Sequence, residues 1–132
     1  MKQTMDYVTY AMGIGLIGLF AVTSVRGAAE PNAKATAIFH KMMTAVMVND
    51  YDDFVAEGTD AFKAGMTKPA LESVNHQLAP RLKGGFESTY LGVLNQKGNE
   101  IHLWKLTYTD GEDDTLVKLV LRRDKVEGFW LQ

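Results

Sequence analysis

The spacing of the apolar residues changes in the middle of this chain, close to Gly84-Gly85. Before that point the apolar residues recur at helical spacing, most clearly between Ala33 and Val48. After it they alternate with polar residues in short segments that turn residues separate, a pattern typical of strands. The sequence therefore predicts an α+β fold, in which N-terminal helices pack on one face of a curved antiparallel four-stranded meander.

The helical half divides at residues that stop or cap helices. The first helix, Ala33–Val48, ends at Asn49-Asp50, and Asp50 can cap a short second helix, Tyr51–Glu57. Thr59 or Asp60 begins a brief turn that runs through Phe62 to Gly65.

A further helix begins at Thr67-Lys68-Pro69, because proline is tolerated in the first helical turn. Its inward side carries Leu71, Val74 and Leu78. Pro80 cannot donate a hydrogen bond to the carbonyl of His76, so we expect this helix to kink or end there.

Four strands are expected in the second half, and short turns join them. The turns are Lys97-Gly98-Asn99, Asp110-Gly111 and Asp124-Lys125, and connections this short require antiparallel pairing. The expected strands are Phe86–Leu94, Glu100–Thr109, Thr115–Arg123 and Val126–Leu131.

A two-residue turn between Arg123 and Val126 places Leu119 opposite Trp130. An amphipathic sheet then also needs Trp104 opposite Leu121 and Leu106 opposite Leu119. The inward face in this register carries Trp104, Leu106, Tyr108, Val117, Leu119, Leu121 and Trp130. The outward face carries Lys105, Thr107, Lys118 and Arg122, together with the apolar Leu103, Val120, Phe129 and Leu131.

The first thirty residues have the features of a secretory signal peptide. Lys2 is followed by an uncharged stretch from Tyr7 to Val25 and by the small residues Gly27-Ala28-Ala29. We therefore expect a signal peptide at residues 1–29, a single domain at residues 30–132, and a periplasmic or secreted location. The alternative is an uncleaved membrane anchor, because nineteen uncharged residues are within the range that spans a bilayer.

Composition limits the partners and chemistry of the exported part. From Ala28 onward there are 12 Lys and Arg residues against 15 Asp and Glu residues, so there is no excess of positive charge for nucleic acid. The chain has no cysteine, which leaves neither disulfides nor thiolate chemistry. We expect no cofactor.

The order of these elements resembles a known superfamily. A helix ends at Val48-Asn49-Asp50-Tyr51-Asp52, another follows Thr67-Lys68-Pro69-Ala70-Leu71, and a meander closes on residues 124–130. This is similar to small exported bacterial domains of unknown function in the nuclear-transport-factor-2-like, or cystatin-like cone, superfamily. The resemblance implies a curved sheet around a long helix, a cone that can hold a small hydrophobic ligand, and dimers formed sheet to sheet. Its members include enzymes and proteins with no known activity, so the fold does not select a function.

The only histidine on the inward strand face is His102, opposite Arg123 in the expected register. Proton transfer would need a carboxylate close to it, and Asp50, Asp52 and Asp53 are the candidates. The simpler interpretation is a half-exposed histidine at the end of the sheet. The acidic residues do not form a calcium loop, because Val55 occupies the position where such a loop needs glycine.

These observations predict a non-enzymatic exported domain that binds a small ligand or another protein. The alternatives are a lyase or isomerase that uses His102 inside the cone, and an accessory domain tethered to the membrane by a retained leader. Expected cone-lining residues are Tyr90, Trp104, Tyr108 and Trp130. The expected partner is a second copy of the chain, bound through the outer sheet face at Leu103, Val120, Phe129 and Leu131.

Overall fold

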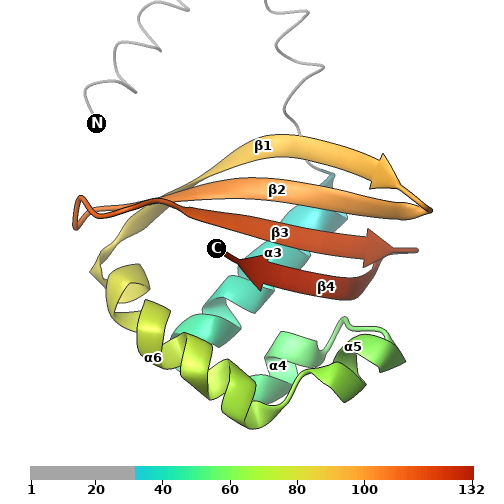
Figure 1. Cartoon of the computed structure of the whole chain (residues 1–132), viewed down its shortest axis with the longest axis horizontal. Helices are drawn as coiled ribbons and strands as arrows, with labels where there is room; N and C mark the ends of the chain where they lie inside the picture. Colours follow the sequence, from blue (N-terminus) through green and yellow to red (C-terminus); the bar gives the residue numbers. More distant parts are fainter. Residues whose placement is uncertain (1–31) are drawn as a thin grey trace, which may run out of the picture. The chain divides into compact units, whose positions relative to one another are not determined.

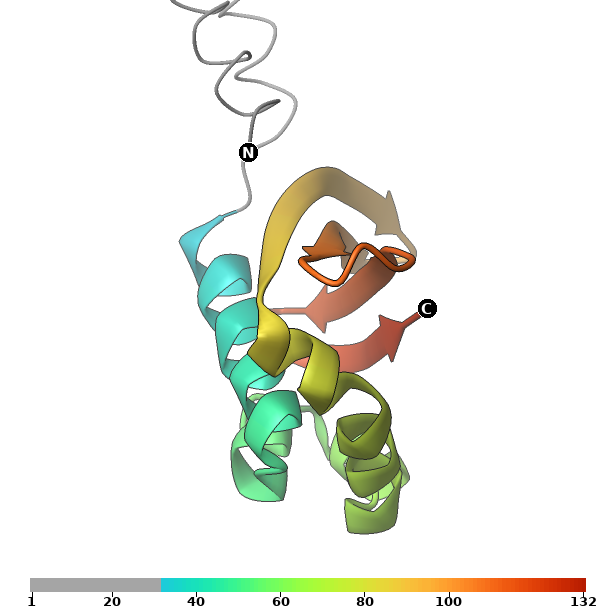
Figure 2. The same cartoon turned by 90° about the vertical axis from the view of Figure 1, so that its left-hand side faces the viewer.

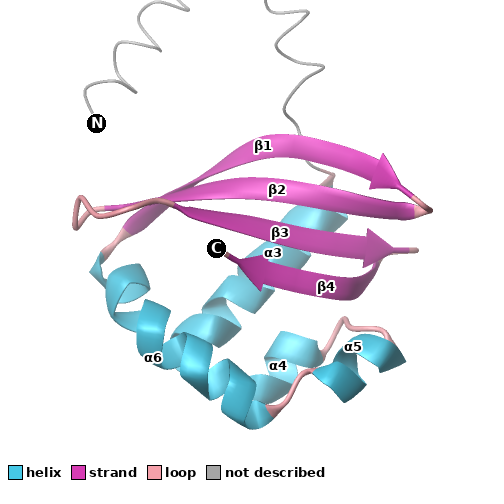
Figure 3. Ribbon diagram, viewed as in Figure 1, coloured by secondary structure: helices cyan, strands magenta, loops and turns pink. Residues whose placement is uncertain are grey.

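Helices occupy the first half of the described chain and strands the second, as the change in apolar spacing predicts (Figure 1, Figure 3). The computed structural model describes residues 32–132, and the expected signal peptide lies outside the described residues. The elements are α3 (Ala33–Val48), α4 (Tyr51–Val55), α5 (Asp60–Gly65), α6 (Lys68–Gly84), β1 (Phe86–Gln96), β2 (Asn99–Tyr108), β3 (Thr115–Arg122) and β4 (Lys125–Leu131).

A side chain caps the N-terminus of each helix. The expected cap at Asp50 is confirmed, since Asp50 accepts a hydrogen bond from the amide of Asp53, and Thr67, at the expected start of α6, accepts one from the amide of Ala70. Each such cap stabilises a helix by about 1 kcal/mol. Asn32 and Thr59 cap α3 and α5 in the same way.

We expected α6 to kink or end at Pro80, and the structure carries it through the proline to Gly84, so the helix does not end there. Pro80 lies on the exposed side of the helix, where water can bind the carbonyl that loses its donor. On the other side Ala79 and Leu82 are buried. The burial of these two side chains stabilises the last turn of α6, although Pro80 cannot donate one of its backbone hydrogen bonds.

The four strands pair in chain order as an antiparallel meander, which confirms the predicted sheet. The helices lie on one side of this sheet, and β1 curls over at the far edge (Figure 2). Two-residue turns join β1 to β2 at Lys97-Gly98 and β3 to β4 at Arg123-Asp124. All four turn residues have positive φ, as a type I′ turn requires. The second turn is one residue earlier than expected.

Two registers differ from the prediction, with different consequences. Trp104 lies opposite Val117 rather than Leu121, a shift of four residues that leaves every side chain on its predicted face. Between β3 and β4, however, an irregularity at Val120 and Leu121 leaves Glu127 without a partner. Because side chains alternate between the two faces of a sheet, one extra residue in a strand moves every later side chain of that strand to the opposite face.

This β-bulge reverses the C-terminal part of β4. Phe129 and Leu131 lie opposite Leu119 and Val117 and pack against the core, so their placement on the outer face is wrong. Trp130 lies opposite Lys118 on the outer face and is 51% exposed, so its placement in the core is also wrong.

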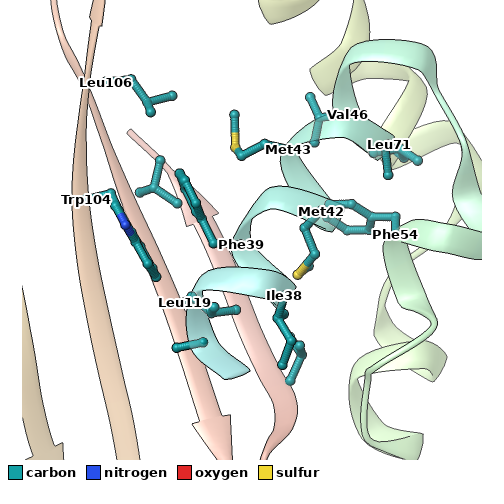
Figure 4. Packing of buried hydrophobic residues seen from close by; sticks show 14 of the residues in the cluster. Ile38, Phe39, Met42, Met43, Val46, Phe54, Leu71, Trp104, Leu106 and Leu119 are labelled. Atoms are coloured by element: carbon teal, nitrogen blue, oxygen red, sulfur yellow. The ribbon is translucent and has the colours of Figure 1, made fainter. Parts of the chain in front are cut away.

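The core is the layer between α3 and the sheet (Figure 4). Phe39 of α3 stacks on Trp104 of β2 with ring centroids 4.1 Å apart and planes 8° from parallel. Met42 and Met43 are buried beside it, as expected for residues that fill a core. These large side chains occupy the concave side of the sheet.

Candidate functional site

The inner face of the first hairpin carries a polar cluster of Tyr90, Glu100 and His102. His102 is only 2% exposed, so its interpretation as a half-exposed histidine is wrong. It lies opposite Leu119 of β3 and Val93 of β1, not opposite Arg123. The corrected register moves it from the end of the strand into the sheet.

Both ring nitrogens of His102 have a partner. The hydroxyl of Tyr90 lies 2.9 Å from Nδ1, and a carboxylate oxygen of Glu100 lies 3.1 Å from Nε2. A carboxylate only accepts hydrogen bonds, so Nε2 carries a proton and donates it to Glu100. With this single proton on the ring, Nδ1 is the acceptor and the Tyr90 hydroxyl donates to it. A buried histidine inside an apolar layer is thereby fully satisfied.

The phenol of Tyr90 keeps its proton in this cluster. Partial burial, and next the negative charge of Glu100, raise the pKa of Tyr90 above its usual value. Tyr90 therefore remains protonated at neutral pH. The arrangement Tyr90–His102–Glu100 is a continuous hydrogen-bonded chain from a partly buried phenol to a half-exposed carboxylate.

The carboxylate beside His102 comes from Glu100, not from the predicted acidic residues. Asp50, Asp52 and Asp53 are exposed, and Asp50 is used as the cap of α4. Sequence reasoning missed Glu100 although the signal was present, because residues two apart in a strand share a face. Tyr90 was predicted as a lining residue, and its contact with His102 depends on the register of β1.

Of the other expected lining residues, Trp104 and Tyr108 are inside. Trp104 is 3% exposed beneath Phe39, and the Tyr108 hydroxyl donates to Thr115 at 2.8 Å. Arg81 of α6 lies 3.7 Å from the centre of the Tyr108 ring. These contacts show aromatic side chains used in packing, so the interior beside them is filled.

The same arginine ties α6 to the loop between β2 and β3. Arg81 forms a two-pronged ion pair with Asp110, with nitrogen–oxygen distances of 2.7 and 3.2 Å. The Arg81 hydrogen bonds, followed by one from the amide of Glu112, lower the pKa of Asp110. The acidic hairpin tip therefore holds the helical layer onto the sheet.

The outer face carries an unbroken apolar row across all four strands. Leu94 lies opposite Ile101, Ile101 opposite Val120, and Val120 opposite Gly128. The indole of Trp130 covers Gly128, because a side-chain carbon added at Gly128 would collide with that ring. We define the outer apolar surface as Leu94, Ile101, Leu103, Val120 and Trp130, residues that are half-buried or exposed.

The surface is bordered by charged side chains. Lys118 lies 5.7 Å from the centre of the Trp130 ring, and Arg122 is 4.0 Å from Glu127. Lys105 is exposed on the same face. An apolar centre with a charged border is the composition of protein association surfaces.

Two cavities lie between α6 and β4. One of about 230 Å³ is lined by residues that include Leu71, Val74 and Phe129. The other, of about 200 Å³, is lined by residues that include Val74, Leu78 and Leu131. A third, polar depression of about 480 Å³ lies where α3 meets α6, around Asn49, Lys68 and Glu72.

Within residues 32–132 no three potential ligand side chains are grouped to hold a metal ion. Among the helices that the structure describes, none has both the length and the apolar character needed to cross a bilayer. Comparisons of the chain with protein-family models, with curated proteins and with solved structures gave no match.

Proposed function

We propose that this protein is a non-enzymatic interaction module that forms a two-fold dimer through the outer apolar surface. The observation that carries the proposal is Trp130, a large aromatic residue that is 51% exposed at the edge of an apolar row. Tryptophan is among the residues that contribute most to binding at interfaces. A contiguous apolar surface with a charged border is an association site more often than an accident of composition.

The filled interior supports this choice over a ligand-binding cone. Phe39 covers Trp104, and Arg81 covers Tyr108. A small hydrophobic ligand bound at Trp104 or Tyr108 would have to displace one of these stacked pairs.

The lyase or isomerase alternative depends on His102 reaching a substrate. Both of its ring nitrogens already bind Tyr90 and Glu100, and the residue is almost completely buried. A general base must come within hydrogen-bond reach of the proton that it removes. The geometry therefore favours a structural role for the histidine.

The helices followed by a curved meander support a relationship to the nuclear-transport-factor-2-like superfamily, for which sheet-to-sheet dimers are expected. We retain this relationship as part of the proposal. Residues 1–29 are proposed to direct export and to be removed near Ala28 or Glu30. N-terminal sequencing of the exported protein tests that assignment, and an intact Met1 in the membrane fraction would favour the membrane-tethered alternative.

Light scattering over a range of concentrations tests the dimer. The protein should have twice the mass of one chain, and Ile101→Lys should have the mass of one chain, because it places a charge in the centre of the surface. Glu72→Lys, on the exposed side of α6, is the matched control and should remain dimeric. A wild-type protein that stays monomeric up to the highest concentration would refute the proposal.

A further inference from the structure

β4 lies at one edge of the sheet and β1 at the other, and within the described residues the free side of β4 is only partly paired. β4 is the last strand of the sheet, and its edge faces the helical layer beside α6 (Figure 1). Among the residues that the structure describes, the segment Glu57–Thr59 pairs with this edge at Val126, through hydrogen bonds of 2.8 and 2.9 Å. The chain then leaves the edge and enters α5.

Beyond Val126, two residues of β4 direct their backbone N–H and C=O groups toward the free edge of the strand. Gln132 exchanges both of its backbone hydrogen bonds with Leu116 of β3. In an antiparallel pair such residues alternate with residues whose groups point the other way. The N–H and C=O groups of Phe129 and Leu131 therefore point away from β3, toward the open edge.

The two cavities between α6 and β4 lie on the helix-facing side of this edge. Their volumes of about 230 and 200 Å³ are several times the roughly 30 Å³ that one water molecule occupies. Both are lined by Val74 and Leu131, and no charged side chain lines either of them. The uncharged Gln77, Thr115 and Gln132 complete the second cavity.

We propose that the edge of β4 binds an extended peptide segment of another protein, with uncharged apolar side chains at alternate positions. The peptide would add a fifth strand by bonding to the backbone of Phe129 and Leu131. Because strand side chains alternate between faces, every second one would enter the space between β4 and α6. This site shares Trp130 with the outer apolar surface, because Trp130 also lines the first cavity, but peptide binding at the edge does not need a second copy of the chain.

An extended peptide fits this edge better than a second copy of the domain. The helical layer lies beside the edge (Figure 2), and a second domain would bring its own α6 to the same place. A single extended chain needs only the spacing of one strand, about 4.8 Å. The Glu57–Thr59 segment already occupies the edge in this way at Val126.

The test uses four capped heptapeptides in which threonine alternates with valine, isoleucine, leucine or phenylalanine. Nuclear magnetic resonance of the protein should show that at least one of them shifts the amide signals of Phe129 and Leu131 and slows their hydrogen exchange at least tenfold. Val74→Lys should weaken that binding at least tenfold. Gln77→Trp, at an exposed position, fills the cavity from its rim and should act likewise if Val74→Lys unfolds. Ile101→Lys, on the other face, should bind the peptide normally.

Three results would overturn the proposal. The first is that none of the four peptides at millimolar concentration changes the amide signals of Phe129 and Leu131. The second is protection of these amides that grows with protein concentration without peptide, which would assign the edge to a second copy. The third is protection that is present at every concentration without peptide, which would assign the edge to the chain's own N-terminal segment.

Discussion

The indole ring of Trp130 lies against the backbone of Gly128, two residues earlier on the same face of β4. Glycine leaves room for a flat ring on the sheet, and the ring in turn buries a residue that has no side chain of its own. Pairing an aromatic ring with a strand glycine offsets the glycine's weak strand propensity. This contact forms one end of the outer apolar surface.

Gly128→Ala tests the importance of that contact. The new methyl group would displace the indole, but a half-exposed ring can swing into solvent, so unfolding free energy should change by less than about 1 kcal/mol. Tryptophan fluorescence should gain a red-shifted component that iodide quenches, and dimerisation should weaken about tenfold, which corresponds to about 1.4 kcal/mol. Glu72→Ala, at an exposed position of α6, is the control and should change neither quantity. If the dissociation constant of the dimer is unchanged in Gly128→Ala, Trp130 does not contribute to the dimer interface.

The two tryptophans should respond oppositely to truncation. Trp104→Ala removes a ring that is stacked on Phe39 in the core and should lower the unfolding free energy by about 3–5 kcal/mol. Trp130→Ala should lower it by less than about 1 kcal/mol in the monomer, because the residue is half exposed. Urea denaturation at low protein concentration measures both. A larger loss for Trp130→Ala would contradict the register of β4.

The polar cluster predicts an unequal effect of removing the two partners of His102. Tyr90→Phe leaves a buried ring nitrogen without a hydrogen bond and should cost about 1–3 kcal/mol. Glu100→Gln keeps an acceptor oxygen at the half-exposed position and should cost less than about 1 kcal/mol. Denaturant titration of the two variants at neutral pH provides the comparison. Equal costs would mean that the burial of His102 does not depend on the Tyr90 hydroxyl.

Acid should weaken the contact between α6 and the β2–β3 loop. The pKa of Asp110 is lowered in the folded protein by Arg81, so the carboxylate stabilises the fold above the ordinary aspartate pKa near 4. That contribution is lost as the pH falls through the lowered folded-state pKa. Asp110→Asn should therefore be less stable than the wild type between about pH 5 and 8, and the difference should shrink below about pH 4. If the difference in unfolding free energy between the two proteins stays constant down to pH 2, the Arg81–Asp110 ion pair does not contribute to stability in this way.

The alternation of apolar and polar residues predicts the face on which a side chain lies, but it does not predict its partner on the next strand. Alternation assigned Trp104 and Leu119 to the inner face correctly, and their expected partners between β2 and β3 were wrong by four residues, an even number that alternation does not detect. Trp130 was placed inside because the bulge at Glu127 leaves no mark in the hydrophobic pattern. The contact between Tyr90 and His102 depends on the register of β1, and a second irregularity beside Gly92 alters that register.

Dipolar electron paramagnetic resonance tests the dimer through the outer face most directly. The chain has no cysteine, so a single spin label can be attached at Lys105→Cys on the border of that surface. Two sheets that pack face to face lie about 10 Å apart, and the labels of the two chains should therefore be within about 30 Å of each other. Labels at Glu72→Cys on α6 should be farther apart, because both helical layers lie between them. No dipolar coupling at Lys105→Cys, or a shorter distance at Glu72→Cys, would contradict self-association through this face.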